Sequence, residues 1–353
     1  MPADRLTTQD LNPRQPLPEL PRVEAAVLRV LAGISVTASA SVAGLPTADL
    51  TEAVAAFHRA GRDALQRQAA ANCWQAYIEF EDWDTSRSTA VTKLAPALHS
   101  ATAVGATWWF IRKYPCWRLR LHNPSAGNAA ATIAIALDDL VKGGAVRRWW
   151  QSVYEPEEPA FGGPLAMTVA HTLFHADSTQ ILNPPTVPLG QRELSVLLCT
   201  AMFRAAGAEW YEQGDVWHRV SLERPFPSET DTSRLDTLIG DVHNLLHADT
   251  SADGPLFGIT GPLMPAARWA EDFRRAGREL GEANRTGALE RGLRQVLSYH
   301  VIFHWNRLGL PTHAQALLAA AASRAILEEE PTDPDGRAAI GSSLNRRPGS
   351  PWS

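Results

Sequence analysis

The chain has 353 residues, of which 45% are hydrophobic and 20% charged, and its formal net charge at pH 7 is −5. These values are typical of a folded globular protein and argue against direct nucleic-acid binding, because a phosphate backbone attracts a basic surface. No apolar run reaches the ~20 residues that cross a membrane, and we expect no cleaved leader, no membrane partner and a cytoplasmic location.

Residues 1–22 are rich in proline and are expected to form a flexible lead-in. A small helical module should follow over residues 23–70. Its first helix ends at Gly33, and its second runs from Thr47, a suitable N-cap, to about Gln68. The spacing is similar to that of a helix-turn-helix, but the second helix is not basic, so nucleic-acid binding is not assigned to it.

Strands and helices alternate from residue 73 onward. The apolar pattern predicts strands over residues 74–80, 107–112, 116–122 and 146–154, and helices over residues 85–100 and 128–141. This succession, β-α-β-β-α-β, is that of a ferredoxin-like antiparallel sheet unit, so the predicted fold class is α+β. Helices should cover one face of the sheet and leave the other free for a partner or a further domain.

Beyond Pro164 the apolar residues recur with the period of helices. We expect helices over residues 165–176, 191–211, 235–247, 266–285, 289–308 and 312–328. Residues 328–353 are polar, with proline and glycine, which predicts a disordered tail. The main domain is therefore expected to span residues 73–327.

The predicted strand over residues 116–122 alternates apolar and cationic side chains. One face carries Trp117, Leu119 and Leu121, and the other carries Arg118, Arg120 and His122. Adjacent cations repel one another unless an anion or an acidic partner lies between them, and a guanidinium fits a carboxylate well. The pattern indicates an anion-binding strand; the alternative is a solvated face whose arginine stems lie over neighbouring residues.

Three pairs of histidines stand four residues apart in predicted helices, a spacing that puts both rings on one helix face, as a metal site requires. They are His171 and His175, His243 and His247, and His300 and His304. No third ligand stands at a suitable spacing, and the cysteines, Cys73, Cys116 and Cys199, are far apart. We therefore expect neither a metal site nor a disulfide, and interpret the histidines as hydrogen-bonded or surface groups.

Two further polar segments could contribute to a site. Tyr154 precedes an acidic loop, and Gly162 and Gly163 then stand at a helix start, where backbone N–H groups can approach an anion. A plain turn is the alternative. Asp177 and Ser178 follow at a helix end, where they could cap a turn or position a ligand.

His300, His304 and Arg307 share one face of the helix predicted over residues 289–308. His304 is a candidate proton-transfer group, because imidazole exchanges a proton near neutral pH. The alternative is a helix end whose last carbonyls are satisfied by these side chains. The residues by themselves lead as far as an anion-binding site for a peptide or a small molecule.

Four motifs, taken in order, resemble one family. They are Trp108-Trp-Phe-Ile-Arg112 with Trp117-Arg-Leu-Arg120, Tyr154-Glu-Pro-Glu157 with Phe161-Gly-Gly163, Phe174-His-Ala-Asp-Ser178, and His304-Trp-Asn-Arg-Leu-Gly309. Together they resemble the thiopeptide-type bacteriocin biosynthesis domain, which is also the C-terminal elimination domain of class I lantibiotic dehydratases. The resemblance covers about residues 73–325, and the helical module before it resembles that of free-standing members.

The resemblance implies peptide chemistry without a cofactor. In lantibiotic dehydratases a separate domain glutamylates a serine or threonine of a ribosomally made precursor peptide from glutamyl-tRNA, and the elimination domain then removes the Cα proton and expels glutamate. This chain would accordingly be a lyase that works with a separate glutamylating subunit. Two alternatives stay open: a synthase that joins two dehydroalanines in a formal 4+2 cycloaddition, as free-standing thiopeptide relatives do, or a non-catalytic subunit that binds the precursor peptide.

The same resemblance implies roles for individual residues. Arg118 and Arg120 would hold the glutamyl carboxylate, and His304 would be the acid or base, with His300 in reserve. Further substrate contacts are expected from Arg112, His122, Tyr154, Asp177, Ser178, His300 and Arg307.

One position departs from the family pattern. Elimination domains of the nisin type carry an arginine just before the aromatic-Gly-Gly, and here that residue is Ala160. Arg112, Arg147 or Arg148 would have to replace it. The identity of the precursor peptide and the oligomeric state stay open at this point.

Overall fold

A computed structural model describes residues 20–71, 73–225 and 232–328 of the protein. The chain divides into two compact units, residues 1–71 and 72–353. Nearly all of the expected lead-in and of the expected tail lies outside the described residues. Within the described ranges, no helix combines the length and the apolar character needed to cross a bilayer.

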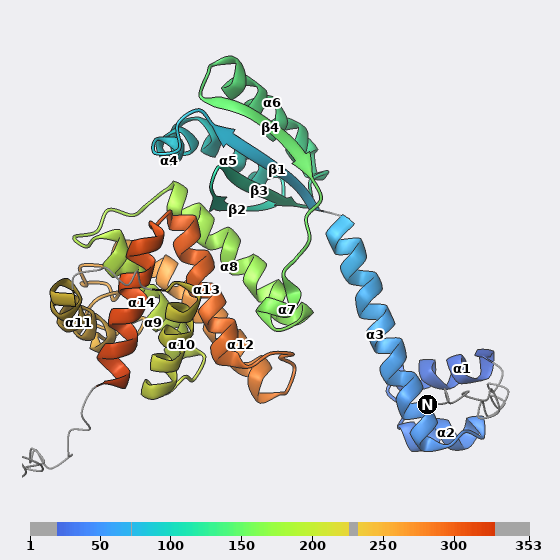
Figure 1. Cartoon of the computed structure of the whole chain (residues 1–353). Helices are drawn as coiled ribbons and strands as arrows, with labels where there is room; N and C mark the ends of the chain where they lie inside the picture. Colours follow the sequence, from blue (N-terminus) through green and yellow to red (C-terminus); the bar gives the residue numbers. More distant parts are fainter. Residues whose placement is uncertain (1–19, 72, 226–231, 329–353) are drawn as a thin grey trace, which may run out of the picture. The chain divides into compact units, whose positions relative to one another are not determined.

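The described part of the first unit contains α1 (Leu20–Leu31), α2 (Val36–Ala43) and α3 (Thr47–Ala71) (Figure 1). Their small core contains Ala26, Val27, Ala40 and Leu50. The sequence pattern did not predict α2, which is short and depends on its caps. The Ser35 side chain accepts a hydrogen bond from the Ala38 N–H at 3.2 Å, and Gly44 ends the helix with a φ of 61°.

The second unit begins with a four-stranded sheet of β1 (Cys73–Phe80), β2 (Thr107–Lys113), β3 (Cys116–His122) and β4 (Val146–Ser152). The strands lie in the order β2-β3-β1-β4, and each neighbouring pair is antiparallel. One face carries α4 (Ser86–Thr89), a π-helical turn (Ala90–Leu94), α5 (Ala95–Ala103) and α6 (Ala129–Lys142) (Figure 1). The predicted α+β class is confirmed, and the ferredoxin-like assignment stays a prediction.

Alternation along the strands decides which side chains enter the core under these helices. Trp117, Leu119 and Leu121 of β3 are buried together with Ile133 and Leu137 of α6. Each large apolar side chain buried in this way contributes roughly 1.5–3 kcal/mol. Because successive side chains of a strand point to opposite faces, the cationic residues of β3 lie on the other side of the sheet, as the sequence predicted.

Helix α8 (Pro164–Leu182) connects the sheet to the helical part of the unit by covering the outer edge of β2. His175 Nδ1 lies 2.8 Å from the Trp108 carbonyl oxygen, and the Phe110 N–H donates to Ser178 Oγ at 3.2 Å. These contacts satisfy backbone groups that an edge strand would otherwise leave unpaired. His175 and Ser178 thus have contacts to the backbone of the sheet.

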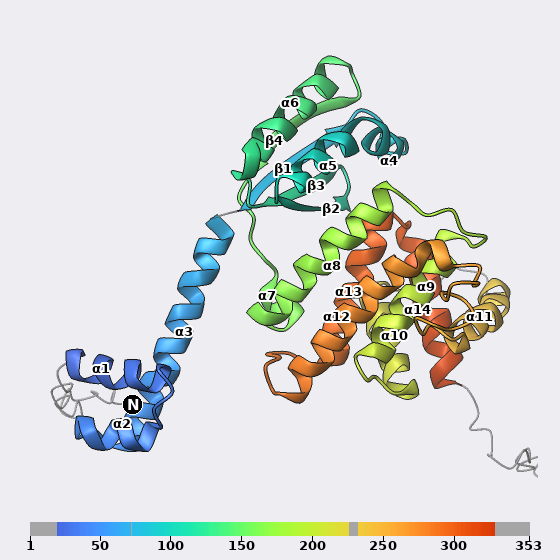
Figure 2. The ribbon, with the colours of Figure 1, turned by 180° about the vertical axis from the view of Figure 1, so that it is seen from behind.

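The remaining helices pack beside α8 as a bundle (Figure 2). They are α7 (Glu158–Phe161), α9 (Gln191–Ala205), α10 (Trp210–Glu223), α11 (Thr232–His247), α12 (Ala267–Arg285), α13 (Leu293–Leu308) and α14 (Thr312–Leu327). The single helix expected over residues 191–211 is wrong. Gly207 adopts a φ of 83° after α9, and Glu209 and Glu212 form a capping box that begins α10.

Candidate functional site

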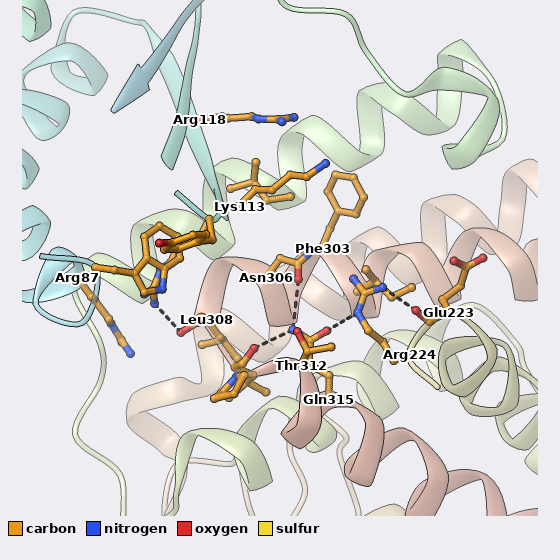
Figure 3. Close-up of a pocket in the computed structure, with 18 of the residues that line it drawn as sticks. Arg87, Lys113, Arg118, Glu223, Arg224, Phe303, Asn306, Leu308, Thr312 and Gln315 are labelled. Atoms are coloured by element: carbon orange, nitrogen blue, oxygen red, sulfur yellow. Dashed lines mark hydrogen bonds between the residues drawn. The ribbon is translucent and has the colours of Figure 1, made fainter. Parts of the chain in front are cut away.

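A cleft of about 960 Å³ lies between the sheet and the helical bundle (Figure 3). Arg118 and Lys113 extend into it from the sheet, and Phe303 and Asn306 of α13 form the opposite wall. Its other lining residues include Ile111, Arg112, Arg120, Glu157, Arg224, Tyr299, Ile302, Gly309, Thr312 and Gln315. Cationic side chains outnumber acidic ones in this lining, which favours an anionic ligand.

Arg120 is held rigidly at this cleft although its side chain is only 3% exposed. Its Nε donates to Gln75 Oε1 at 2.9 Å, and its guanidinium carbon lies 4.4 Å from the centre of the Tyr154 ring. One terminal nitrogen lies 3.6 Å from Glu157 Oε1, and the other has no hydrogen-bond partner among the described residues. A fixed, buried guanidinium with an unused donor is suited to a carboxylate ligand.

Arg118 lies two residues earlier on the same face of β3 and lines the same cleft. Its guanidinium carbon lies 5.1 Å from the centre of the Tyr77 ring. No carboxylate of the described chain lies within 4.0 Å of its guanidinium nitrogens, so no ion pair neutralises its charge there. The structure therefore brings Arg118 and Arg120 together at one cleft, and their role stays a prediction.

Glu157 is a cleft residue that the sequence analysis left out. Its Oε1 faces Arg120, and its Oε2 is buried without a hydrogen-bond partner within the described ranges. The available signal was the acidic loop of residues 155–158, which was interpreted only as a connection before the double glycine. Its carboxylate is a group on this wall that could accept a proton.

Arg112 also lines the cleft, held between two indole rings. Its guanidinium carbon lies 5.0 Å from the Trp83 ring centre and 5.3 Å from that of Trp117. The side chain presses against Gly309, whose φ of 75° and lack of a Cβ allow this approach. Arg112 is thus a cation of the cleft, placed beside the C-terminal end of α13.

Tyr154 packs its ring against the Arg120 guanidinium and forms a hydrogen bond with His171. Its hydroxyl lies 2.7 Å from His171 Nε2, and the Trp109 ring lies 4.7 Å from the imidazole, centre to centre. Burial raises the pKa of Tyr154 well above its usual value. Burial, with the nearby charges of Arg120 and His122, lowers the pKa of His171 to about 4. The imidazole is therefore neutral near pH 7 and shares a hydrogen bond with the Tyr154 hydroxyl.

His304 lies in a buried network rather than in this cleft. Its Nδ1 lies 3.0 Å from both carboxylate oxygens of Asp177, which also accepts from Arg307 Nε at 2.6 Å and from Trp269 Nε1 at 2.9 Å. His304 and Asp177 are 0% exposed. Burial acts to raise the pKa of Asp177, but the His304 and Arg307 charges outweigh it and hold that pKa below its usual value.

The helix that carries His304 therefore lines the Arg118 and Arg120 cleft, but the His304 side chain does not. Helix geometry gives the reason, because successive residues turn by about 100° around the axis. The α13 residues that line the cleft are Tyr299, Ile302, Phe303, Asn306 and, at the end of the helix, Leu308. His304 falls on another face and lines a separate pocket of about 140 Å³ beside Trp269 and Ser195. A catalytic role for His304 stays a prediction.

The remaining predicted site residues lie apart from the cleft lining. His300 is 1% exposed, both its ring nitrogens lack a partner in the described structure, and burial, with the Arg307 charge, lowers its pKa to about 3. His122 is half-buried at the end of β3. Arg147 and Arg148 pair with Glu79 instead of lining the cleft. Arg112 is thus the one of the three suggested replacements that lines the cleft.

The paired histidines have separate partners. His171 contacts Tyr154, His175 contacts the backbone of β2, and His304 contacts Asp177, whereas His243 and His247 contact each other with their Nε2 atoms 3.1 Å apart. Within residues 20–71, 73–225 and 232–328, no group of three or more histidine, cysteine or acidic side chains is arranged to hold a metal ion.

The chain belongs to the family described as lantibiotic biosynthesis dehydratase C-term, whose profile matches residues 74–326. This confirms the family resemblance carried by the four motifs. No curated protein matches the sequence.

Two solved structures show the same fold. The tRNA-dependent lantibiotic dehydratase MibB from Microbispora sp. 107891 is 18% identical with a TM-score of 0.52, and the match covers 73% of this chain and 28% of MibB. The pyridine synthase TbtD from thiomuracin biosynthesis is 13% identical with a TM-score of 0.51, and the match covers 73% of this chain and 98% of TbtD. This chain therefore corresponds to a minor part of the dehydratase.

Proposed function

We propose that this protein is a lyase of ribosomal peptide biosynthesis that eliminates glutamate from glutamylated serine or threonine residues of a precursor peptide. The observation that carries the proposal is the pair of guanidiniums, Arg118 and Arg120, on one cleft wall with the Glu157 carboxylate beside them. The family membership supports peptide modification in general. A separate glutamylating subunit would supply the substrate, and its use of glutamyl-tRNA implies a cytoplasmic location.

The proposed reaction uses the cleft residues as follows. Glu157 accepts the proton from Cα of the modified residue, and the C–H electron pair forms the Cα–Cβ double bond. The Cβ–O bond breaks, and its electron pair leaves on the carboxylate of glutamate. Arg118 and Arg120 hold the glutamyl group and stabilise the departing carboxylate, since preorganised donors in a partly desolvated site favour developing negative charge. Arg112 supplies the additional cation that Ala160 does not.

The test is release of glutamate by the purified full chain from a synthetic peptide that carries O-glutamylserine. We expect free glutamate and a dehydroalanine product, detected by mass spectrometry. Arg120→Ala should lower the rate at least about 100-fold, the scale for losing a preorganised donor. The matched control is Arg285→Ala, because Arg285 is exposed and pairs with Glu282 at the surface. A wild-type protein without release, or equal rates in the two variants, would contradict the proposal.

The second candidate is the 4+2 cycloaddition of two dehydroalanines. It is favoured by the cleft volume of about 960 Å³, which leaves room for a folded peptide segment. The same preparation should then convert a peptide with two dehydroalanines into a ring with loss of its leader. A third candidate, a non-catalytic subunit that binds the precursor peptide, is favoured by the alanine at position 160 and by the burial of His304.

A further inference from the structure

A row of stacked side chains crosses the sheet face that carries Arg118. Tyr77 of β1 stands directly opposite Arg118 of β3 and Trp150 of β4. The Tyr77 and Trp150 rings are parallel within 6°, with centres 5.3 Å apart, and Arg118 lies 5.1 Å from the Tyr77 ring. Arg148 covers Trp150 at 5.1 Å. We call Arg118, Tyr77, Trp150 and Arg148 the aromatic row.

The outer half of the aromatic row is open to solvent. Trp150 is 39% exposed and the Arg148 side chain 68%. Trp149, the preceding residue of β4, points to the opposite face and donates a hydrogen bond to Asp138 of α6. In the described part of the second unit, β4 packs mainly against β1 and α6. A stacked indole left exposed beside cations is a feature of binding surfaces more than of a solvated sheet face.

The aromatic row is continuous with the cleft, because Arg118 belongs to both. Neighbouring strands are about 4.8 Å apart, so Trp150 lies roughly 10 Å from Arg118 across the sheet. A chain leaving the cleft over Arg118 would therefore pass Tyr77 and then Trp150 within three or four extended residues.

We propose that the aromatic row binds an extended segment of the peptide substrate, with apolar or aromatic side chains stacked on Tyr77 and Trp150 and a carboxylate beside Arg118. This inference deepens the proposed function and rests on it for the identity of the substrate. Arg118 has no ion pair with the described residues, so its charge favours an acidic neighbour, and the two rings favour apolar side chains.

Single-stranded RNA, the other polymer that stacks on rings, fits this surface less well. Glu79 takes the charges of both Arg147 and Arg148, and Glu81 also pairs with Arg147. The sheet edge therefore lacks the unneutralised cations that follow a phosphate backbone. The whole chain is also acidic, with a net charge of −5.

The test measures binding of two fluorescein-labelled probes to the full chain by fluorescence anisotropy. One is a short synthetic peptide that alternates aspartate and phenylalanine with glycine spacers, and the other is an oligouridine of similar length. We expect the peptide to bind the wild type, and Tyr77→Ala with Trp150→Ala to weaken it about tenfold. Trp150→Phe, which keeps a ring, should restore most of the affinity. The matched control is Tyr211→Ala, which removes an exposed ring from α10.

Equal affinity for the double variant and the Tyr211→Ala control would overturn the inference, as would tighter binding of the oligouridine than of the peptide. Circular dichroism of each variant shows whether it is folded, and Trp150→Phe gives a readout even where the alanine variants unfold. The two proposals fail separately. If no glutamate is released but peptide binding depends on Tyr77 and Trp150, the lyase proposal is rejected and the aromatic row remains as a peptide site. If glutamate is released but binding does not depend on these rings, the lyase proposal stands and the aromatic row is rejected.

Discussion

The guanidinium of Arg120 lies 4.4 Å from the centre of the Tyr154 ring, and the hydroxyl of the same ring is bonded to His171. The ring fixes the guanidinium by its face and is itself fixed by its hydroxyl. Tyr154→Phe should keep the face and lose the hydrogen bond, lowering the rate of glutamate release by about threefold to tenfold. Tyr154→Leu loses both and should approach the Arg120→Ala rate. Steady-state rates at saturating peptide provide the comparison, and identical rates in the two variants would mean that the ring face is unimportant.

The proton acceptor can be identified by comparing two variants. Glu157→Gln keeps the size of the side chain and removes its basicity, so release of glutamate should fall about 100-fold or more if Glu157 accepts the Cα proton. His304→Gln should keep most activity in the molecules that remain folded, because His304 does not line the cleft. Single-turnover rates normalised to folded protein measure this. A larger loss in His304→Gln than in Glu157→Gln would return the catalytic role to the histidine.

The buried Asp177 network predicts a large loss of stability. Asp177→Asn leaves the buried guanidinium of Arg307 without its counter-charge, and breaking such a pair costs about 3–5 kcal/mol. The matched control is Asp215→Asn, because Asp215 pairs with Arg219 and Arg294 nearer the surface, where a pair contributes about 0–1 kcal/mol. Urea unfolding monitored by tryptophan fluorescence gives both values. Equal losses of unfolding free energy in the two variants would show that the buried Asp177 pair contributes no more to stability than the pair nearer the surface.

The stability of the fold should decrease in mild acid, because His300 takes up a proton more readily when the protein unfolds. Its folded pKa is about 3, whereas an unfolded histidine has a pKa of about 6.5. Between these values the unfolded state binds more protons, so the free energy of unfolding decreases as pH falls, by up to about 1.4 kcal/mol per pH unit. His171, with a folded pKa of about 4, acts in the same direction.

His300→Leu should therefore flatten the pH dependence of stability between about pH 6.5 and pH 4.5. The matched control is His313→Leu, since His313 is exposed at the start of α14. Urea midpoints across this pH range measure the slope. A slope that is unchanged in His300→Leu would show that His300 does not titrate in the way its burial implies.

Gly309 supports the position of Arg112 by having no side chain. Gly309→Ala would place a Cβ against the guanidinium and force an unfavourable φ of 75° on alanine, costing about 1 kcal/mol or more. Arg112 should leave its place between Trp83 and Trp117, with a change in tryptophan emission. Gly287→Ala is the control, because Gly287 also has a positive φ but open space around it. An emission change of the same size in both variants would argue against the contact.

The sequence predicted the four strands, most of the helices, the alternation of β3 and the family. It did not predict α2 or the division between α9 and α10, where short-range caps at Ser35 and Glu209 outweigh the apolar period. It also ended α8 before Asp177 and Ser178, whereas the helix continues to Leu182. It placed His304 on the right helix and could not tell which face of that helix meets the sheet. The sequence did not identify Glu157 as a cleft residue, because a loop has no periodicity that indicates where its side chains point.

The sequence by itself determined which face of each strand or helix is buried and which carries polar side chains, because the periods of 2 and 3.6 residues are local properties of the backbone. Thus Arg118 and Arg120 had to share a face of β3 opposite its buried leucines. Only the tertiary structure decided what that face meets. Packing of α13 against α8 and α12 turned His304 toward Asp177 and left Phe303 and Asn306 facing the arginines. Contacts between distant segments depend on the summed packing of the whole unit, which no local pattern records.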